Sequence, residues 1–215
     1  NFNEIYENIN NDKSIASIIN YPDSDIDLNQ SMKINNKKNN NKKYDCNIGV
    51  IGSGNFSRMT LLPNLNNCNV NFKTLSSQKG ISAESLSRKY KFEKITSNYK
   101  EIITDKSIDT IFIVTRHDSH AKIIQECLNS DKNVFVEKPL ALNIDEVNSI
   151  INSIKPDSNL MIGFNRRFSP HIELVKNSIN KDKSVPINII INMNAGFISP
   201  EHWVHDLQIG GGRII

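Results

Sequence analysis

The feature that most constrains the fold of this chain is a short apolar run that ends in two closely spaced glycines. The stretch Asn47–Leu61 reads NIGVIGSGNFSRMTL, so a strand-like segment enters a Gly-Ser-Gly turn and a segment with helical spacing leaves it. Gly52 permits the tight turn, Gly54 lets the backbone approach a pyrophosphate without an intervening Cβ, and Ser57 is small enough for close helix–strand packing. The turn therefore predicts a dinucleotide phosphate site at a helix N-terminus; a plain strand-to-helix corner is the alternative.

Apolar runs and helical patterns alternate along the chain after this turn. The predicted strands are Asn47–Ile51, Val70–Leu75, Thr110–Thr115, Asn133–Val136 and Leu160–Gly163. The predicted helices are Phe56–Leu65, Ala83–Tyr90, Asn98–Thr104, Asp118–Leu128 and Asn143–Ile154. Asn98, Asp118 and Asn143 are the expected caps, the first and last of them with a Glu three residues later, at the spacing of a capping box. This alternation is typical of an α/β fold, a Rossmann-like doubly wound parallel sheet whose strand C-termini line one ligand-binding edge.

The regular alternation of predicted strands and helices ends near Pro170, and the sequence can be divided into four predicted regions. Residues 46–165 form the predicted dinucleotide-binding Rossmann domain, and residues 166–215 the incomplete, truncated start of an α+β substrate domain with a predicted strand over Pro186–Asn194. Only about 45 residues follow Pro170, too few for an independent domain of ordinary size. Residues 26–45 are a predicted Asn/Lys-rich linker, because Asn35–Lys43 (NNKKNNNKK) offers no apolar group to bury. A basic arm that binds phosphate polymers is the alternative.

Composition narrows the class of protein. The 215 residues, formal net charge of +3 and 38% hydrophobic residues fit a soluble globular protein. No apolar run approaches the roughly 18–20 residues that span a bilayer, and the first residues, NFNEIYENIN, lack the pattern of a secretory signal. Cys46, Cys68 and Cys127 suggest neither a disulfide framework nor a zinc site, because they are widely spaced and odd in number. We therefore expect a cytoplasmic protein with no nucleic acid or membrane partner.

The corner after the second predicted strand bears on the choice of cofactor. It reads TLSSQKG, with Ser76 and Ser77 where many dinucleotide-binding proteins carry an acidic residue. A carboxylate there would accept from the 2′-hydroxyl of NAD and repel the 2′-phosphate of NADP. Serines with Lys79 could accommodate a phosphate, although a solvated Lys79 explains the sequence equally well. Either NAD or NADP is therefore expected.

Three stretches together carry a family resemblance: NIGVIGSGNF, TRHDSHAKIIQECLNSDKNVFVEKPLALN and MIGFNRRFSPHI. They are similar to segments of the glucose–fructose oxidoreductase/inositol dehydrogenase/MocA (Gfo/Idh/MocA) family. The similarity covers roughly Cys46 to Ile215, and Glu137-Lys138-Pro139 is its most specific motif.

Two further features resemble a branch of that family in which a zinc-type medium-chain alcohol dehydrogenase precedes the Gfo-like half. TRHD replaces the more usual Thr-Pro-Asn, and NAGFISPEHWVHDLQIGGGRII resembles the branch's segment that leads into the substrate domain. Residues 1–25 would then be the tail of the preceding domain, because Phe2–Pro22 resembles a helix followed by a last strand. In that case the chain is a fragment of a longer polypeptide.

The resemblance implies an NAD(P)-dependent oxidoreductase that transfers a hydride between nicotinamide and a hydroxyl of a sugar, cyclitol or sugar nucleotide. Lys138 matches the family lysine that contacts the substrate hydroxyl and helps to position the nicotinamide. Alcohol oxidation leaves a proton to remove and a developing oxyanion to stabilise. An ammonium can do the second task, and the first where burial desolvates it. A surface ion pair between Lys138 and Glu137 is the alternative.

The other expected site residues follow from the glycine turn and the same resemblance. His120 matches the family histidine near the nicotinamide ribose, with a satisfied surface group as the alternative, and Arg116 and His117 replace the usual Pro-Asn. The residues expected to contact the cofactor are Gly52, Gly54, Asn55, Phe56, Ser57, Ser76, Thr115, Arg116, His117, His120, Glu137 and Lys138. Lys138, Arg166 and Trp203 are the residues expected to contact the substrate, and Lys138 is the expected catalytic residue. For Arg166 and its neighbour Asn165, a polar linker contact where the domains join is the alternative, and it is slightly favoured.

The sequence EHWVHD offers a competing metal interpretation. His202, His205 and Asp206 have a possible ligand spacing, but no further ligand cluster supports it, and no metal is predicted. The family's second catalytic motif, with an acidic residue and a histidine, lies downstream of GGGRII and so beyond Ile215. A nucleotide-binding module without catalytic activity is therefore the alternative to an enzyme, and an interaction protein that acts through its Asn/Lys segment is a third. A homo-oligomer is left open.

Overall fold

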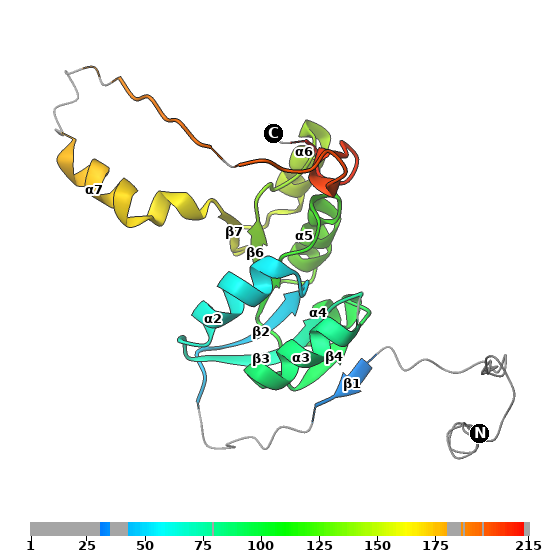
Figure 1. Ribbon diagram of the computed structural model, residues 1–215. Helices are drawn as coiled ribbons and strands as arrows, with labels where there is room; N and C mark the ends of the chain where they lie inside the picture. The colour runs from blue at the N-terminus through cyan, green and yellow to red at the C-terminus, as the bar shows by residue number, and fades with distance from the viewer. Residues whose placement is uncertain are drawn as a thin grey trace, which may run out of the picture.

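One sheet organises the chain in the computed structural model, which describes residues 31–34, 43–78, 80–179, 186, 188–194 and 196–212. This seven-stranded sheet has the order β1-β4-β3-β2-β5-β6-β7 (Figure 1). The strands are β1 (Ser31–Lys33), β2 (Cys46–Ile51), β3 (Val70–Ser76), β4 (Lys94–Thr96), β5 (Thr110–Ile113), β6 (Asn133–Glu137) and β7 (Leu160–Gly163). Neighbouring strands pair in parallel, except that β1 pairs antiparallel with β4.

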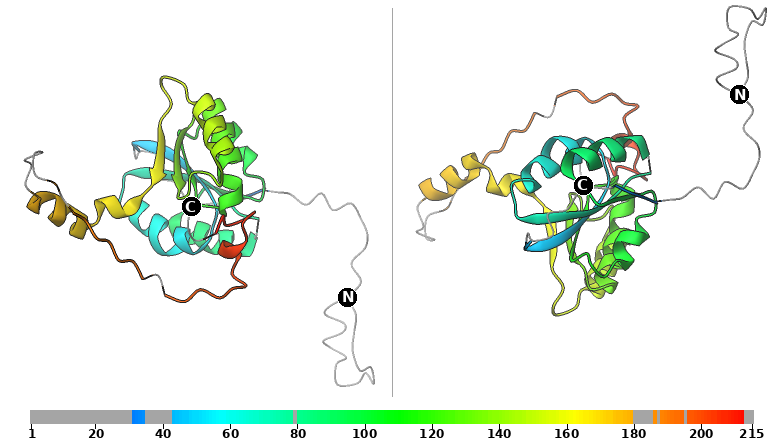
Figure 2. Two further views of the ribbon diagram at one scale, coloured as in Figure 1. Left: turned by 90° about the horizontal axis from the view of Figure 1, so that it is seen from above. Right: turned by 90° about the horizontal axis from the view of Figure 1, so that it is seen from below.

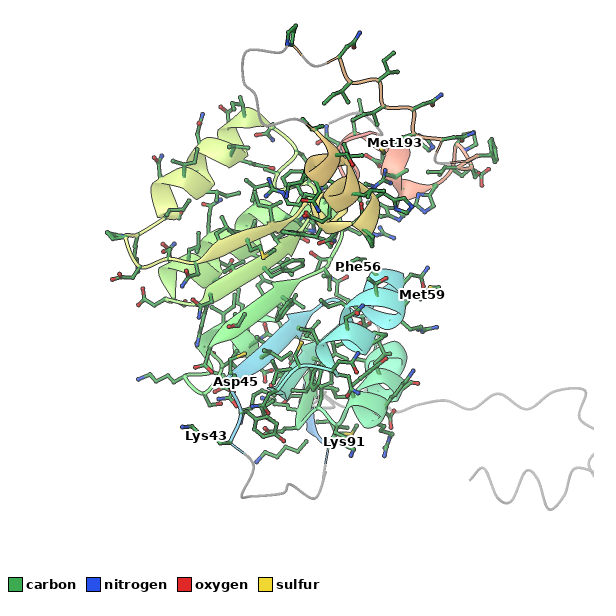
Figure 3. The ribbon with its side chains drawn as sticks, turned by 90° about the vertical axis from the view of Figure 1, so that its left-hand side faces the viewer. Lys43, Asp45, Phe56, Met59, Lys91 and Met193 are labelled. Carbon is green, nitrogen blue, oxygen red and sulfur yellow. The ribbon has the colours of Figure 1, made fainter. Side chains whose placement is uncertain are left out.

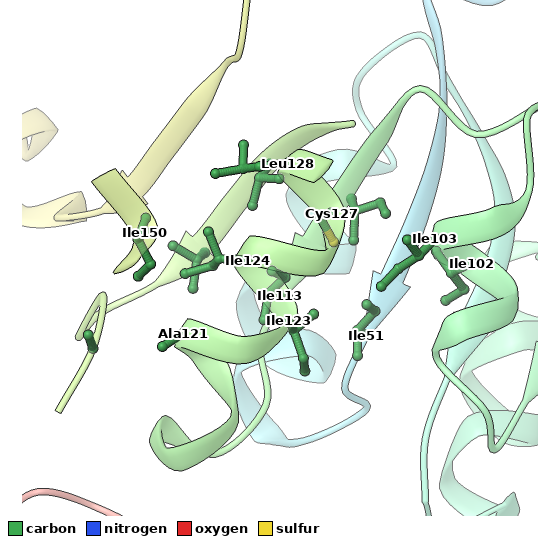
Figure 4. Packing of buried hydrophobic residues seen from close by; sticks show 14 of the residues in the cluster. Ile51, Ile102, Ile103, Ile113, Ala121, Ile123, Ile124, Cys127, Leu128 and Ile150 are labelled. Carbon is green, nitrogen blue, oxygen red and sulfur yellow. The ribbon is translucent and has the colours of Figure 1, made fainter. Parts of the chain in front are cut away.

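Helices cover both faces of this sheet, as Figure 2 shows. The covering helices are α2 (Leu62–Leu65), α3 (Gly80–Tyr90), α4 (Lys100–Thr104), α5 (His120–Asn129) and α6 (Ile144–Ser153), whereas α7 (Pro170–Ser178) lies beyond the last strand. Successive residues of a strand point to opposite faces, so Ile48 and Val50 of β2 join a buried cluster with α2 and α3. Ile51 joins a second cluster with α4, α5 and α6, part of which Figure 4 draws. The predicted α/β, Rossmann-like doubly wound fold is confirmed.

The strands and helices predicted between Asn47 and Gly163 are all present, with shifted ends. The predicted helix Phe56–Leu65 begins as a π-helical turn over Ser57–Leu61 before α2. The sequence patterns missed β1 and β4, because three residues are too few to show alternation. β1 lies within the segment predicted as a linker, and Ile34 after it is buried, with its N–H donating to the Glu93 carbonyl at 2.8 Å.

The cap predicted at Asn143 is confirmed. Its side-chain oxygen accepts from the Glu146 N–H at 2.9 Å. The cap predicted at Asp118 is wrong: α5 begins at His120, after a 3-10 turn over His117–Ser119. The reason is that the Asp118 N–H donates to the Ile209 carbonyl at 3.1 Å, which holds this residue in the turn.

Only one half of the capping box predicted at Asn98 forms. Asn98 does accept from the Lys100 N–H through its side chain, at 3.1 Å. The Glu101 carboxylate, however, accepts from the Lys94 ammonium at 2.5 Å and from the Thr96 hydroxyl at 2.9 Å. A charged donor on the neighbouring strand binds a carboxylate more strongly than a backbone N–H does.

The chain after β7 is less regular. The strand predicted over Pro186–Asn194 is wrong for the residues described there, 186 and 188–194, which form no strand. A strand needs a neighbour to pair with, and none of the described elements pairs with this segment. Figure 1 shows α7 and this segment leading away from the sheet before the chain returns to the region of α5.

Some predictions fall on parts of the chain that are not described. Residues 1–25 and most of the Asn/Lys segment lie outside the described residues, so the predicted tail of a preceding domain and the predicted linker stay predictions. Among the described residues, no helix has the length and apolar character needed to cross a bilayer.

Candidate functional site

The glycine turn lies between the end of β2 and the π-helical turn. Gly52 has a φ of +115°, and a Cβ there would lie 2.5 Å from the Val114 carbonyl oxygen, so only glycine fits without a shift. The Ser57 side chain is fully buried, and its hydroxyl donates to the Gly52 carbonyl at 2.7 Å. The serine in the third position of the fingerprint therefore helps to hold the turn closed on the helix.

Gly54 differs from Gly52 in what surrounds it. A Cβ built at Gly54 would have no heavy atom within 4 Å, so the space beside this backbone is open. The first turn of a helix leaves N–H groups without intrahelical partners, and Asn55 and Phe56 belong to that first turn. Figure 3 shows Phe56 at the start of this helix, beside the end of β2. Open space next to unpaired N–H groups suits a phosphate.

The end of β3 forms a neutral, polar corner. The Ser76 side chain is buried in the strand. The Ser53 hydroxyl, from inside the glycine turn, donates to the Ser77 hydroxyl at 2.6 Å. No carboxylate lies between Ser76 and Gln78, and Lys79 falls outside the described residues. The corner therefore offers hydroxyl groups, but no described charge, to an adenosine ribose.

The end of β5 continues the same edge of the sheet. The Thr115 and Ser119 hydroxyls lie 2.7 Å apart, and the Ser119 hydroxyl donates to the Arg116 carbonyl at 2.8 Å. These bonds close the 3-10 turn that leads into α5. They bring Arg116 and His117 to the edge that also holds the glycine turn.

His120 is buried at the start of α5, with no solvent-exposed surface. Its Nδ1 lies 2.7 Å from the Pro139 carbonyl oxygen, and its Nε2 lies 3.3 Å from the Thr115 carbonyl oxygen. Burial lowers the pKa of His120 below its ordinary value, although the two carbonyl contacts oppose this. The surface-group alternative for His120 does not fit this burial, and no part of the ring is open to a cofactor.

Glu137 ends β6, Lys138 follows it, and a cis peptide bond joins Lys138 to Pro139. The Glu137 carboxylate accepts from the Asn165 side-chain amide at 2.8 Å. Burial raises the pKa of Glu137, an effect that the Asn165 bond and the nearby Lys138 and His117 charges partly offset. Lys138 itself is exposed and takes part in no ion pair among the described residues. The ion-pair alternative for Lys138 is thus not supported, and neither is a desolvated ammonium acting as a base.

The segment after Gly196 returns to the end of β5. The His117 Nδ1 donates to the Gly210 carbonyl at 2.8 Å, and the Trp203 ring packs edge-on against the His117 ring with centroids 4.9 Å apart. The Arg116 guanidinium lies 5.6 Å from the centre of the same indole. Trp203, Arg116 and His117 are therefore one contact group, although they come from distant parts of the sequence.

Arg166 is not part of that contact group. Its guanidinium contacts the Met193 sulfur at 2.6 Å, on the extended segment that follows α7. A shallow hollow of about 450 Å³ is lined by Arg167, Phe168, Ile172 and Lys176. None of these residues belongs to the glycine turn or the ends of β5 and β6, so the hollow does not mark the candidate site.

The metal interpretation of EHWVHD gains nothing from the geometry. The His202 Nδ1 accepts from the Val204 N–H at 3.3 Å, and the Asp206 carboxylate accepts from the Gln208 N–H at 2.8 Å. Both groups are thus used within their own loop. No group of three or more His, Cys, Asp and Glu side chains suited to a metal is found in the described part of the chain.

Sequence reasoning assigned no role to Ser53, which bonds Ser77 at the ribose corner, or to Ser119, which closes the turn into α5. For Asn165 the sequence favours only a polar linker contact, and its amide donates to the Glu137 carboxylate. Ser53 could have been found, because it lies between the two glycines and opposite the strand end that carries the ribose contact. The partners of the other two could not be inferred without the fold.

Comparisons with known proteins agree with this geometry. The family model for Gfo/Idh/MocA, an oxidoreductase family with an NAD-binding Rossmann fold, matches residues 46–164. The uncharacterized oxidoreductase YrbE of Bacillus subtilis is 30% identical over 129 residues, which are 60% of this chain and 38% of that protein. Inositol 2-dehydrogenase of Rhizobium meliloti is 27% identical over 144 residues, 66% of this chain and 43% of that enzyme.

Among solved structures, myo-inositol 2-dehydrogenase from Lactobacillus plantarum superposes with a TM-score of 0.59 at 28% identity. The superposition covers 63% of this chain and 40% of that one. The chain spans about two fifths of the length of these relatives. The residues that match the family model, 46–164, include the glycine turn and Lys138.

Proposed function

Since this chain belongs to the Gfo/Idh/MocA family, whose matched domain is an NAD-binding Rossmann fold, we propose that it is the dinucleotide-binding part of an oxidoreductase. The reaction is a hydride transfer between the nicotinamide of NAD or NADP and a hydroxyl carbon of a sugar, cyclitol or sugar nucleotide. One observation carries the proposal: the glycine turn after β2 and Lys138 after β6 lie at the same C-terminal edge of a parallel sheet.

The fit of a dinucleotide rests on Gly54. The open space at its Cβ position, beside the first helical N–H groups, is the cradle that a pyrophosphate requires. Gly52 and Ser57 hold the backbone that forms this cradle. When bound, the nicotinamide would supply the hydride acceptor or donor. Ser77 and Ser53 offer the ribose only neutral groups, which is compatible with either cofactor, whereas the Ser76 side chain is buried.

Lys138 is the proposed catalytic residue. Its ammonium, exposed at the edge of the sheet, can donate a hydrogen bond to the substrate hydroxyl oxygen and stabilise the negative charge that develops there as the hydride leaves. Trp203 and Arg166 are the proposed substrate contacts, and Arg116 and His117, after β5, are proposed contacts of the nicotinamide end of the cofactor. The inositol dehydrogenases among the relatives support a cyclitol or a similar polyol as the substrate.

A second candidate function is a nucleotide-binding module without turnover. The observation that favours it is the exposure of large apolar side chains after β7, Leu174 on α7 and Ile190 and Phe197 beyond it, which leaves no formed substrate wall among the described residues. We further propose that the protein is cytoplasmic, that it acts on a small molecule, and that it has no nucleic acid or membrane partner. A homo-oligomer and a preceding alcohol dehydrogenase domain are also proposed.

Cofactor binding is tested by titrating the chain with NADH and NADPH while following the fluorescence of Trp203, its single tryptophan. Saturation at 100 times the dissociation constant should stabilise the fold by about 2.7 kcal/mol. Gly54→Val should abolish binding with no loss of stability, because its side chain would occupy only the open space. Met59→Ala, an exposed change on the same helical turn, is the matched control. Equal binding by Gly54→Val and the control would contradict the proposal.

Turnover is tested separately, with a panel of inositols and sugars in the presence of NAD⁺ or NADP⁺. Lys138→Ala should lower kcat by about 10²–10³-fold, as the loss of an oxyanion-stabilising group does. Lys122→Ala, an exposed lysine on α5, should leave kcat unchanged. Cofactor binding without any turnover would favour the second candidate function over the first.

A further inference from the structure

His120 connects two strand ends at the candidate site. One ring nitrogen faces the carbonyl of Thr115, which follows β5, and the other faces the carbonyl of Pro139, the residue directly after Lys138. The ring is completely buried. A direct contact between His120 and the cofactor, as the family resemblance suggested, would need an exposed atom that this side chain does not have.

The two contacts are not equivalent. A neutral imidazole carries one N–H and one lone pair, and burial favours the neutral form. The Nδ1 distance of 2.7 Å is typical of a strong hydrogen bond, whereas the Nε2 distance of 3.3 Å is at the long end of the range. We therefore assign the proton to Nδ1, which donates to the Pro139 carbonyl. His117, with ring centroids 5.7 Å away, and Asp118 are the titratable neighbours.

The position of Lys138 depends on the hydrogen bond between His120 and the Pro139 carbonyl, because few other contacts hold this residue. Its side chain is exposed and belongs to none of the ion pairs between described residues, so the backbone that carries it fixes the point from which the ammonium reaches the substrate. The carbonyl that His120 binds is one residue further along that backbone. A shift of about 1 Å in a positioned catalytic group can cost about 10²-fold in rate.

We propose that His120 is a positioning residue for Lys138: its Nδ1–H holds the Pro139 carbonyl and so fixes the loop that presents the ammonium to the substrate. This inference rests on the proposed oxidoreductase function for its consequence in the reaction. The hydrogen bond itself does not depend on that function, and the two can be tested apart.

The first experiment uses the full chain and the substitutions His120→Leu and His120→Asn. The amide nitrogen of asparagine takes nearly the place of Nδ1 and keeps a donor, whereas leucine removes it. We expect kcat to fall about 10–100-fold in His120→Leu and to stay within about threefold of the original in His120→Asn. The cofactor dissociation constant should be unchanged in both. His171→Asn, an exposed histidine on α7, is the matched control.

A double-mutant cycle separates positioning from general destabilisation. If His120 acts through Lys138, His120→Leu should lower the residual kcat of Lys138→Ala by less than about twofold. An undiminished 10–100-fold loss in the Lys138→Ala background would overturn the proposal. So would a His120→Asn enzyme as slow as His120→Leu, or a cofactor affinity that falls in parallel with kcat.

A second measurement needs neither activity nor a folded leucine variant. Nitrogen NMR of the unsubstituted chain should find His120 protonated at Nδ1, and still neutral at pH values where an exposed histidine such as His171 is already charged. Amide exchange in residues 137–142 should match the unsubstituted chain in His120→Asn, with residues 144–153 of α6 as the internal control. An Nε2–H tautomer, or an ordinary histidine titration, would overturn the inference even if NAD(P) binds. Failure of NAD(P) to bind would instead refute the proposed function and leave this result standing.

Discussion

Ile124 and Ile190 are the same residue type in two regions with opposite surroundings. Ile124, on α5 in the sheet region (residues 43–164), has 0% of its surface exposed, and Ile190, in the C-terminal region (residues 165–212), has 90% exposed. The sheet region buries its own apolar groups between strands and helices. Among the described residues, the C-terminal region makes polar and ring contacts with the sheet region at Arg116, His117, Asp118 and Glu137. An apolar sequence pattern therefore becomes regular structure only where a packing partner is present.

The largest difference between the two regions is expected when a glycine in each is replaced by alanine. Gly52→Ala should destabilise the fold by at least about 3 kcal/mol, because φ is +115° and the new Cβ would meet the Val114 carbonyl. Gly196 also has a positive φ, +74°, but nothing lies within 4 Å of its Cβ position, so Gly196→Ala should cost only the backbone strain, about 1–2 kcal/mol. Urea unfolding followed by circular dichroism measures both. Equal losses would show that Gly196 is as closely surrounded in solution as Gly52.

The next largest difference in stability between the regions is expected when Ile124 and Ile190 are each replaced by alanine. Ile124→Ala should cost about 2–4 kcal/mol, because it removes buried methyl groups and leaves a cavity in the cluster of Figure 4. Ile190→Ala should change stability by no more than about 0.5 kcal/mol. Thermal unfolding monitored by circular dichroism checks the pair. A large loss at Ile190 would mean that this segment is buried in solution, for example in an oligomer.

The contact between the regions can be tested through Trp203. Trp203→Ala removes the ring that packs on His117 and faces Arg116, which should cost about 1 kcal/mol. The amide of Asp118, which donates to the Ile209 carbonyl, should exchange faster in this variant. Phe197→Ala, a change at an exposed aromatic residue of the same region, should affect neither quantity. Unchanged exchange at Asp118 would show that Trp203 does not hold the regions together.

The smallest expected effect is the pH dependence of folding stability that arises from Glu137. This residue lies where β6 meets the turn that starts the C-terminal region. Burial raises its pKa, so the folded state binds this proton more tightly than the unfolded state. Stability should therefore fall as pH rises from the ordinary glutamate pKa through the raised one. Glu137→Gln, which keeps an oxygen for the Asn165 amide, should abolish this fall and be the more stable form at neutral pH. Chemical denaturation of both proteins at pH 4 and pH 7 measures the free energy of unfolding. If it changed equally with pH in the original chain and in Glu137→Gln, the assigned effect of burial would be contradicted.

Much of the sheet region was predictable because its signals are local. Gly52 with Gly54 and the Asn143 cap each involve residues a few positions apart, and they have the structures that the sequence patterns predict. Apolar alternation located the strands because both faces of the sheet are covered.

The rest required contacts between distant residues. The predicted strand Pro186–Asn194 has the right residue types, but its formation depends on a neighbour that the pattern cannot supply. The burial of His120 depends on the carbonyl of Pro139, 19 residues away. The bond between Ser53 and Ser77 spans 24 residues, and Trp203 reaches His117 from the far end of the chain.

The edge strand β1 has a consequence for how the protein can be handled. Its three residues cover the outer side of β4, on a sheet edge that would otherwise present unpaired backbone groups. Uncovered edges of this kind recruit strands from other molecules. A version shortened to begin at Lys43 would keep the glycine turn and Lys138 but lose that cover, and it should aggregate at lower concentrations than the full chain.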